Sequence, residues 1–522
     1  MALEKLDNKI SNIFYRPYIL IGIIIIISLV VRLNYFPSVP LTLDSLDYFY
    51  YASDISINQK LPENYTPANN GWPIFLSWFF SIVNFEDVIS YMQLQRMVSI
   101  IISVLTIIPI FFLCKKYFGS KLSLVGSAIF AFEPRLIENS LFGITDAMYI
   151  FLITLTLVSF LGTKKIVYLS FVFASFATLV RSEGIVLLTL ISIFFFIKYK
   201  NQKIEFPKFI FALGIMILIL VPIMMIKTDI AGNDIIFSRA VTAVTVFDEY
   251  MYEGNEYGGN PLFTGIENFS KYFIWNLIPI FIFFVPIGIY YLFKKVDLNK
   301  IFIILGIIFF SIPAFWAYSL PLQETRYFYF MYPFLILISL YTLKKISLRK
   351  YSNLILSFIV VGMLFSSIIF LELKINNDQE NEVYLISKEI VDNIKVINLF
   401  QPESKFLEVT QIPEKWKDFS VFFNEDRQQN LSIRDSVNNI KLINSVKFES
   451  LDKMIENSSP KLSHILTDET FNENDFLYDV HNNSNNFPFL EKKFDSKDVG
   501  YNYHIKLFKI NYEKFNEFKN EN

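Results

Sequence analysis

The feature that most constrains this fold is a series of long apolar runs in the first 373 residues. They cover residues 18–31, 97–114, 120–137, 146–161, 166–180, 184–197, 209–226, 272–293, 301–319, 327–343 and 352–371. Each is near the length that a helix needs to cross the hydrocarbon core of a bilayer, although 166–180 is short. The composition, 53% hydrophobic and 17% aromatic, exceeds that of soluble domains. We therefore expect a multi-pass α-helical membrane protein with about eleven transmembrane helices.

The distribution of lysines predicts the orientation. Lysine-rich segments fall in alternate loops: Lys115–Lys116, Lys164–Lys165, Lys198 to Lys208, Lys294–Lys295 and Lys344–Lys345. Because loops rich in Lys and Arg stay in the cytoplasm, the N-terminus is predicted inside and the C-terminus outside. Five N-x-S/T sequons, at Asn64, Asn268, Asn430, Asn457 and Asn482, fall on the predicted outer side. We expect a multi-pass protein of the plasma membrane with a cytoplasmic N-terminus.

The character of the chain changes after residue 373. The polar remainder has an amphipathic helical pattern at 380–394. Strand-like runs follow at 405–412, 420–425, 464–469, 489–494 and 502–512. The sequence therefore predicts two domains: 1–373, a transmembrane catalytic domain with a first outer loop at 33–95, and 374–522, a soluble extracytoplasmic α/β domain.

Charge and cysteine content exclude several functions. The net charge of −2 gives no basic field, so no nucleic-acid partner is expected. The single cysteine, Cys114, excludes an internal disulfide. The apolar runs carry essentially no ionisable residues, which disfavours an ion-coupled transporter. The polar chemistry of the first domain gathers instead in its outer segments.

The stretch 43–56 holds the strongest candidate for a reactive group. Asp44 and Asp47 are three residues apart, so on a helix both carboxylates project from one face. Tyr48, Tyr50 and Tyr51 beside them suit a membrane–water interface. The structural alternative is that Asp44 caps the helix N-terminus and Asp47 belongs to a solvated face.

The order of motifs resembles that of the GT-C membrane glycosyltransferases. Asp44 and Tyr48 are followed by a Gly-Trp-Pro turn at 71–73, and then by segments 133–151, 180–188 and 324–337. The closest similarity, over residues 15–345, is to the protein O-mannosyltransferase and aminoarabinose transferase branch. Ser45 stands where many relatives have a second adjacent acidic residue, so that carboxylate would be Asp47, Glu138 or Asp146. The chain also lacks the WWDYG motif of oligosaccharyltransferases.

The resemblance implies sugar transfer from a polyprenyl-phosphate-linked donor to a hydroxyl of a protein, lipid or glycan acceptor on the outer face of the bilayer. It implies Asp44 as the catalytic base, with Asp47 and Asp146 as the other catalytic carboxylates. Arginines bind phosphate through bidentate hydrogen bonds. The candidates for the donor phosphate are Arg135, Arg181 and Arg326, at predicted outer helix ends.

Each arginine has a structural alternative, as an interfacial anchor or in a local ion pair such as Arg181 with Glu183 or Arg326 with Glu324. No cofactor is required by the sequence. A divalent metal ion is the one candidate, with Asp47, Asp146 and Glu138 as possible oxygen ligands. The functional alternatives are a transporter or flippase of lipid-linked saccharides, an oligosaccharyltransferase-like enzyme, and a non-enzymatic membrane anchor for the second domain.

Overall fold

The structure is a computed structural model. It describes residues 16–62, 69–162, 166–199, 205–231, 261–294, 296–320, 324–393, 398–400, 441–443, 450–458, 461–469 and 476–521, together with residues 7, 10, 14 and 406.

The chain forms two compact units. Unit 1 comprises Met1–Phe36, Leu61–Phe79 and Leu94–Ile375, and unit 2 comprises Pro37–Lys60, Phe80–Gln93 and Asn376–Asn522. Unit 2 thus takes in two segments of the predicted first outer loop besides the C-terminal region. The predicted division at residues 373 and 374 stays a prediction, and each unit is described by itself.

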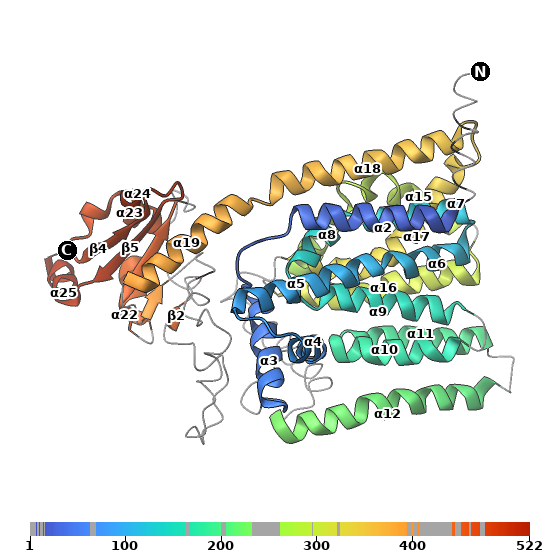
Figure 1. The fold of residues 1–522 in the computed structure, drawn as a ribbon, viewed down its shortest axis with the longest axis horizontal. Helices are drawn as coiled ribbons and strands as arrows, with labels where there is room; N and C mark the ends of the chain where they lie inside the picture. Colours follow the sequence, from blue (N-terminus) through green and yellow to red (C-terminus); the bar gives the residue numbers. More distant parts are fainter. Residues whose placement is uncertain are drawn as a thin grey trace. The chain divides into compact units, whose positions relative to one another are not determined.

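Unit 1 is a bundle of apolar helices (Figure 1). Its helices are α2 (Pro17–Asn34), α4 (Gly71–Ile82), α5 (Val88–Leu105), α6 (Ile107–Tyr117), α7 (Ser120–Ala131), α8 (Pro134–Leu141), α9 (Asp146–Phe160), α10 (Val167–Val180), α11 (Gly184–Tyr199), α12 (Glu205–Ala231), α14 (Pro261–Leu277), η1 (Phe281–Phe283), α15 (Val285–Lys294), α16 (Leu298–Ser319), η2 (Thr325–Met331), α17 (Tyr332–Ile346) and α18 (Ser352–Lys374). The end residues of α4 and the first turns of α5 belong to unit 2.

The predicted multi-pass helical fold is confirmed, while the helices differ in length from the predicted runs. In the described part of the chain, six helices are long and apolar enough to cross a membrane, or seven if α14 and its continuation 281–294 form one span with a bend of 102°. Five further apolar helices have 10–17 residues. At 1.5 Å per residue, about 15 residues rise only about 22 Å, which is less than the hydrocarbon thickness.

Helix α17 lies in the centre of the bundle, and nearly all of its side chains are buried. It packs against α7 and α15. A Cβ atom at Gly288 in α15 would collide with the backbone carbonyl of Ile338, so only glycine permits this close approach of two helices. In contrast, α12 and α18 run along opposite edges of the bundle and expose most of their apolar side chains, as expected for lipid-facing helices (Figure 1).

The C-terminal part of unit 2 is an α/β fold. Its strands are β1 (Asn398–Phe400), β2 (Lys441–Ile443), β3 (His464–Asp468), β4 (Leu490–Asp495) and β5 (Ile505–Ile510). They form one sheet in the order β2-β1-β3-β5-β4, with β1 parallel to β2 and β3, and β5 antiparallel to β3 and β4. Its helices are α19 (Asn377–Asn393), α22 (Leu451–Asn457), α23 (Phe476–Asn482), η4 (Ser484–Asn486), α24 (Ser496–Val499) and α25 (Tyr512–Glu521). The segment Pro37–Lys60 of unit 2 contains α3 (Asp44–Asn58).

The predicted α/β character of this region is confirmed. The amphipathic pattern at 380–394 forms most of α19, and the runs at 464–469, 489–494 and 502–512 contain β3, β4 and β5. The predicted strands at 405–412 and 420–425 lie outside the described residues, apart from residue 406. The amphipathic period of α19 and the apolar runs of β3 and β5 explain why these elements could be predicted from the sequence.

Candidate active site

Helix α3 places both acidic residues of the first outer loop in its first turn. The helix begins at Asp44, and Asp47 follows three residues later, as the spacing predicted. The N-cap position belongs to Leu43, which has a φ of 51° and makes no side-chain cap hydrogen bond. The alternative in which Asp44 is the N-cap is therefore wrong. Carboxylates in a first turn are stabilised by the positive end of the helix dipole, so the position favours two anions.

The buried aromatic residues of α3 show which face of this helix packs inside the protein and which face is accessible to solvent. Tyr48, Tyr50 and Tyr51 are buried within the protein, whereas an interfacial position was predicted. Phe49 packs against Phe80, with ring centroids 5.7 Å apart. Asp44 is exposed and Asp47 is partly buried. The apolar side of the helix thus holds it in place and leaves Asp44 on the accessible side.

A buried ion pair joins two residues predicted for the site, both in unit 1. Asp146 is the first residue of α9, and Arg181 follows the last residue of α10. Arg181 donates through Nη1 to Oδ1 of Asp146 at 2.6 Å, and both side chains are almost completely buried. Oδ2 accepts from Nδ2 of Asn139 at 3.0 Å, and the hydroxyl of Thr145 lies 3.4 Å from Oδ1. The Asp146 carboxylate is therefore fully enclosed by donors.

The same guanidinium makes a second ion pair. Nη2 of Arg181 donates to Oε1 of Glu183 at 2.7 Å, which confirms the local pair raised as an alternative. The guanidinium also lies 4.8 Å from the ring centre of Phe330, whose ring packs edge-to-face on Tyr149. Carboxylates and aromatic rings fix Arg181 in one orientation, which is what a preorganised charge requires.

Arg135 contacts the bent span that is formed by α14 and residues 281–294. It lies in the first turn of α8 and donates through Nη1 to the carbonyl of Ile278 and through Nη2 to that of Trp275 at 2.7 Å. These carbonyls are at the C-terminal end of α14, where helical partners are missing and a positive charge is favourable. Glu133 is fully buried 3.6 Å from Nη1, and its carboxylate has no hydrogen-bond partner among the described residues.

The remaining candidates form ion pairs nearer the surface. Arg326 pairs with Glu324, again as the sequence alternative indicated, and retains 23% of its side-chain exposure. Glu138 pairs with Lys374 at 2.8 Å. Because the oxygens of Asp146 are enclosed by donors and Glu138 holds a lysine, these two carboxylates do not fit a divalent cation. No cluster of three or more potential metal ligands occurs among the described residues.

Several buried cations outside the candidate set, among them Arg32 and Lys227, lie one residue beyond the predicted apolar runs. Arg32, in the last turn of α2, is completely buried and donates to Ser103 at 3.1 Å and Ser140 at 3.2 Å. Lys227, near the end of α12, is buried and donates to Asn70. The prediction that the interiors of the apolar runs carry essentially no charge does not extend to these end positions. Arg32 and Lys227 are basic residues that lie outside the predicted cytoplasmic loops. This exception to the lysine pattern was the signal in the sequence that could have identified them.

A match to a known family falls on this part of the chain. The sequence profile of the dolichyl-phosphate-mannose-protein mannosyltransferase family matches residues 73–226, a segment that contains Arg135, Asp146 and Arg181. The comparison with curated proteins gives no match.

Two membrane enzymes have similar solved structures. ArnT from Cupriavidus metallidurans, solved bound to undecaprenyl phosphate, has a TM-score of 0.53 at 10% identity, covering 93% of this chain and 97% of that chain. The apo oligosaccharyltransferase of Archaeoglobus fulgidus has a TM-score of 0.55 at 12% identity, covering 87% of this chain and 70% of that chain. In its structure with a tethered acceptor peptide the TM-score is 0.50 at 12% identity; 75% of this chain and only 62% of that chain are covered.

The class follows from these findings together. The chain has the fold of the GT-C membrane glycosyltransferases, and the resemblance predicted from its motifs is confirmed. Within that class it is similar both to the mannosyltransferase profile and to the aminoarabinose transferase fold.

Proposed function

We propose that this protein is a glycosyltransferase that moves a hexose or a pentose from a polyprenyl-phosphate-linked donor to an acceptor hydroxyl on the outer face of the plasma membrane. The observation that carries the proposal is the anchored Arg181, enclosed by Asp146 and Glu183 within the family-matched segment. The similar ArnT was solved with undecaprenyl phosphate, and the oligosaccharyltransferase with an acceptor peptide, which supports a lipid-linked donor and a protein, lipid or glycan acceptor.

In the proposed reaction Asp44 accepts the proton of the acceptor hydroxyl. The acceptor oxygen forms a bond to the anomeric carbon of the sugar, and the bond between that carbon and the phosphate oxygen breaks. The lipid phosphate leaves with the bonding electrons. A general base contributes about 10²–10⁴-fold to such a step. The exposed carboxylate of Asp44 suits this role better than the enclosed carboxylate of Asp146.

The three arginines have different proposed roles toward the leaving phosphate. Both terminal nitrogens of Arg135 and of Arg181 donate within the protein. The side chain of Arg326, which pairs with Glu324, keeps 23% of its exposure, the largest exposed fraction of the three. We therefore assign direct contact with the phosphate to Arg326. Arg181 supplies a fixed positive charge, and Asp146 is a positioning residue.

The alternatives fit less well. An oligosaccharyltransferase shares the fold, but the chain lacks the WWDYG motif. A flippase needs polar groups along a path through the bilayer, whereas the buried cations described here lie at helix ends. An inert anchor requires neither a buried carboxylate–guanidinium network nor an acidic helix. The proposed orientation, with a cytoplasmic N-terminus and an extracytoplasmic C-terminus, places the acidic loop on the outer side.

Substitution of Asp44 tests the proposal. Asp44→Asn keeps the size of the side chain but removes its basicity, so transfer of a radiolabelled sugar from a synthetic polyprenyl-phosphate donor should fall by about 10²–10⁴-fold. Stability should fall by no more than about 1 kcal/mol, the contribution of a negative charge at a helix N-terminus, because Asp44 does not cap α3. Asp87→Asn is the matched control: this exposed residue bonds Ser90 at the start of α5, a role that asparagine fills equally well. Near-normal transfer by Asp44→Asn would remove the proposed base.

A further inference from the structure

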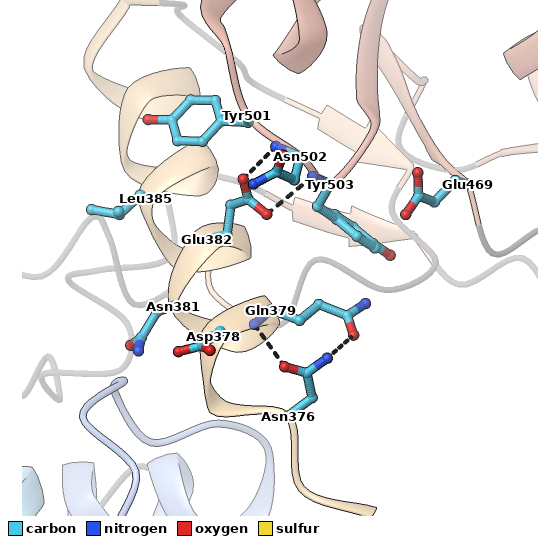
Figure 2. A pocket seen from close by; sticks show the side chains of 10 residues that line it. All are labelled: Asn376, Asp378, Gln379, Asn381, Glu382, Leu385, Glu469, Tyr501, Asn502 and Tyr503. Carbon is cyan, nitrogen blue, oxygen red and sulfur yellow. Dashed lines mark hydrogen bonds between the residues drawn. The ribbon is translucent and has the colours of Figure 1, made fainter. Parts of the chain in front are cut away.

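An open cavity of about 620 Å³ lies in unit 2. Its described lining residues belong to 376–503, far in sequence from α3, the helix that carries Asp44. It is bordered by the first turns of α19 and by residues 501–503, which precede β5 (Figure 2). Its size is within the range of small-molecule sites in proteins, about 300–1,000 Å³. Nothing in the proposed transfer reaction uses this cavity.

The lining has an unusual composition. It consists of three carboxylates, four side-chain amides, two tyrosines and a leucine, and among its described residues there is no lysine, arginine or histidine. A site without cationic groups is unsuited to phosphate, sulfate or an acidic saccharide. The ligand is therefore neutral or positively charged.

Hydrogen bonds within the protein decide between these two. The carboxylate of Glu382 accepts the backbone N–H groups of Asn502 and, at 3.0 Å, of Tyr503 (Figure 2). Glu469 accepts the backbone N–H of His504 at 3.3 Å. Two of the three carboxylates thus already receive hydrogen bonds from backbone donors, which reduces their value for a cation. The groups left to define the site are mainly amides and phenols.

The amides are held in fixed positions. Asn376 caps α19 by accepting the backbone N–H of Gln379 at 3.1 Å, and its own amide donates to Oε1 of Gln379 at 3.2 Å (Figure 2). Asn381 accepts a hydrogen bond from Ser38 at 2.8 Å. A side chain that is already oriented loses less entropy when it binds a ligand.

We propose that this cavity binds an uncharged, hydroxyl-rich saccharide. Each sugar hydroxyl both donates and accepts, which matches amide groups: beside the bonds described, an amide oxygen keeps a second lone pair and its nitrogen a second N–H. Leu385, which is 50% exposed, and the ring of Tyr501 add apolar surface for the C–H faces of a pyranose. The hydroxyl of Tyr501 is anchored on Glu389 at 3.0 Å, so its ring is fixed. The inference is independent of the proposed transfer reaction.

The test uses the full-length protein in detergent, probed with an array of neutral, amino-substituted and acidic oligosaccharides and with oligolysine. Neutral oligosaccharides should bind. The double variant Gln379→Ala/Asn502→Ala, at two exposed positions, should weaken their binding about tenfold or more, as expected for the loss of one or two hydrogen bonds. Asn393→Ala, an exposed amide at the end of α19 outside the cavity, should leave binding unchanged.

Three results would overturn the proposal: no bound oligosaccharide, equal binding by the double variant and the wild type, or preferential binding of oligolysine. Hydrogen exchange of the α19 peptides in each variant confirms that the domain is folded. Because the readout is binding, loss or retention of sugar transfer does not affect the outcome, and the two proposals fail separately.

Discussion

The ion pair between Asp146 and Arg181 should contribute strongly to stability. The two groups are 2.6 Å apart, with side-chain exposures of 0% and 6%. Removing one partner of a buried pair leaves an uncompensated charge and typically costs about 3–5 kcal/mol. In Asp146→Asn, Arg181 would still pair with Glu183 at 2.7 Å, so we expect a cost at the lower end of that range, about 3 kcal/mol.

A double-mutant cycle isolates the interaction. Asp146→Asn, Arg181→Met and the combined variant would be unfolded with sodium dodecyl sulfate in mixed micelles. Because the double variant removes both charges, it should be more stable than the sum of the single effects predicts, by about 1.5–3 kcal/mol. The matched control is the more exposed pair Glu138–Lys374, at 2.8 Å, for which glutamine substitutions should give a coupling below about 1 kcal/mol.

The cycle can refute the argument in a definite way. If the Asp146 and Arg181 effects add within about 0.5 kcal/mol, the two charges do not interact in the folded protein. The proposed positioning role then fails as well. The proposed positioning role of Asp146 makes a second prediction. Asp146→Asn should reduce kcat/KM for the donor, and Asp146→Glu should restore part of it. Loss of stability with normal donor kinetics would mean that the pair is structural only.

Three further outcomes are expected. Arg326→Ala should fold normally but lose about ten- to more than a hundredfold in kcat/KM for the donor, the effect of one charge-assisted contact of about 1.5–3 kcal/mol; wild-type kinetics at limiting donor would contradict the assignment. Single cysteines at positions 430 and 164 test the predicted orientation with an impermeant thiol reagent on intact cells. Only the cysteine at position 430 should be labelled, and labelling of Lys164→Cys would show that the predicted orientation is wrong. Burial lowers the pKa of His464 and His481 from 6.5 to about 4, so the unfolded state binds more protons between these values. The stabilisation they contribute is complete above pH 6.5 and is lost toward pH 4, and hydrogen exchange in β3 and α23 should quicken accordingly.

Local patterns predicted several of the described elements of unit 2. Helix α3 follows from the spacing of Asp44 and Asp47 on an apolar face, and β3 and β5 follow from runs of buried aliphatic residues. The ion pairs of Arg181 with Glu183 and of Arg326 with Glu324 were also visible as alternatives, because partners two residues apart need no tertiary structure. Where neighbours in sequence decide the outcome, the sequence was informative.

The lengths of the membrane helices could not be predicted in the same way. Helices α9, α10 and α11 are apolar because the bundle and the bilayer surround them, and a short buried helix has the same composition as a full span. The bend between α14 and the residues after Ile280 depends on contacts made by Arg135, about 140 positions earlier in the chain. Hydrophobicity reports the surroundings of a residue and not whether its helix crosses the bilayer.

The roles of the arginines depend on tertiary contacts for the same reason. All three sit at helix ends, and by sequence each is an equal candidate for the donor phosphate. The structure separates them by the acceptors that the fold provides. Arg135 donates to two carbonyls at the end of α14, and Arg181 is shared by two carboxylates. A guanidinium whose terminal nitrogens are already paired inside the protein must give up a bond before it can bind phosphate in a fork. Arg326 has the most accessible side chain of the three, with an exposure of 23%. Arg326 is therefore the most accessible of the three to a lipid phosphate. Its substitution is the sharpest test of where the donor phosphate binds.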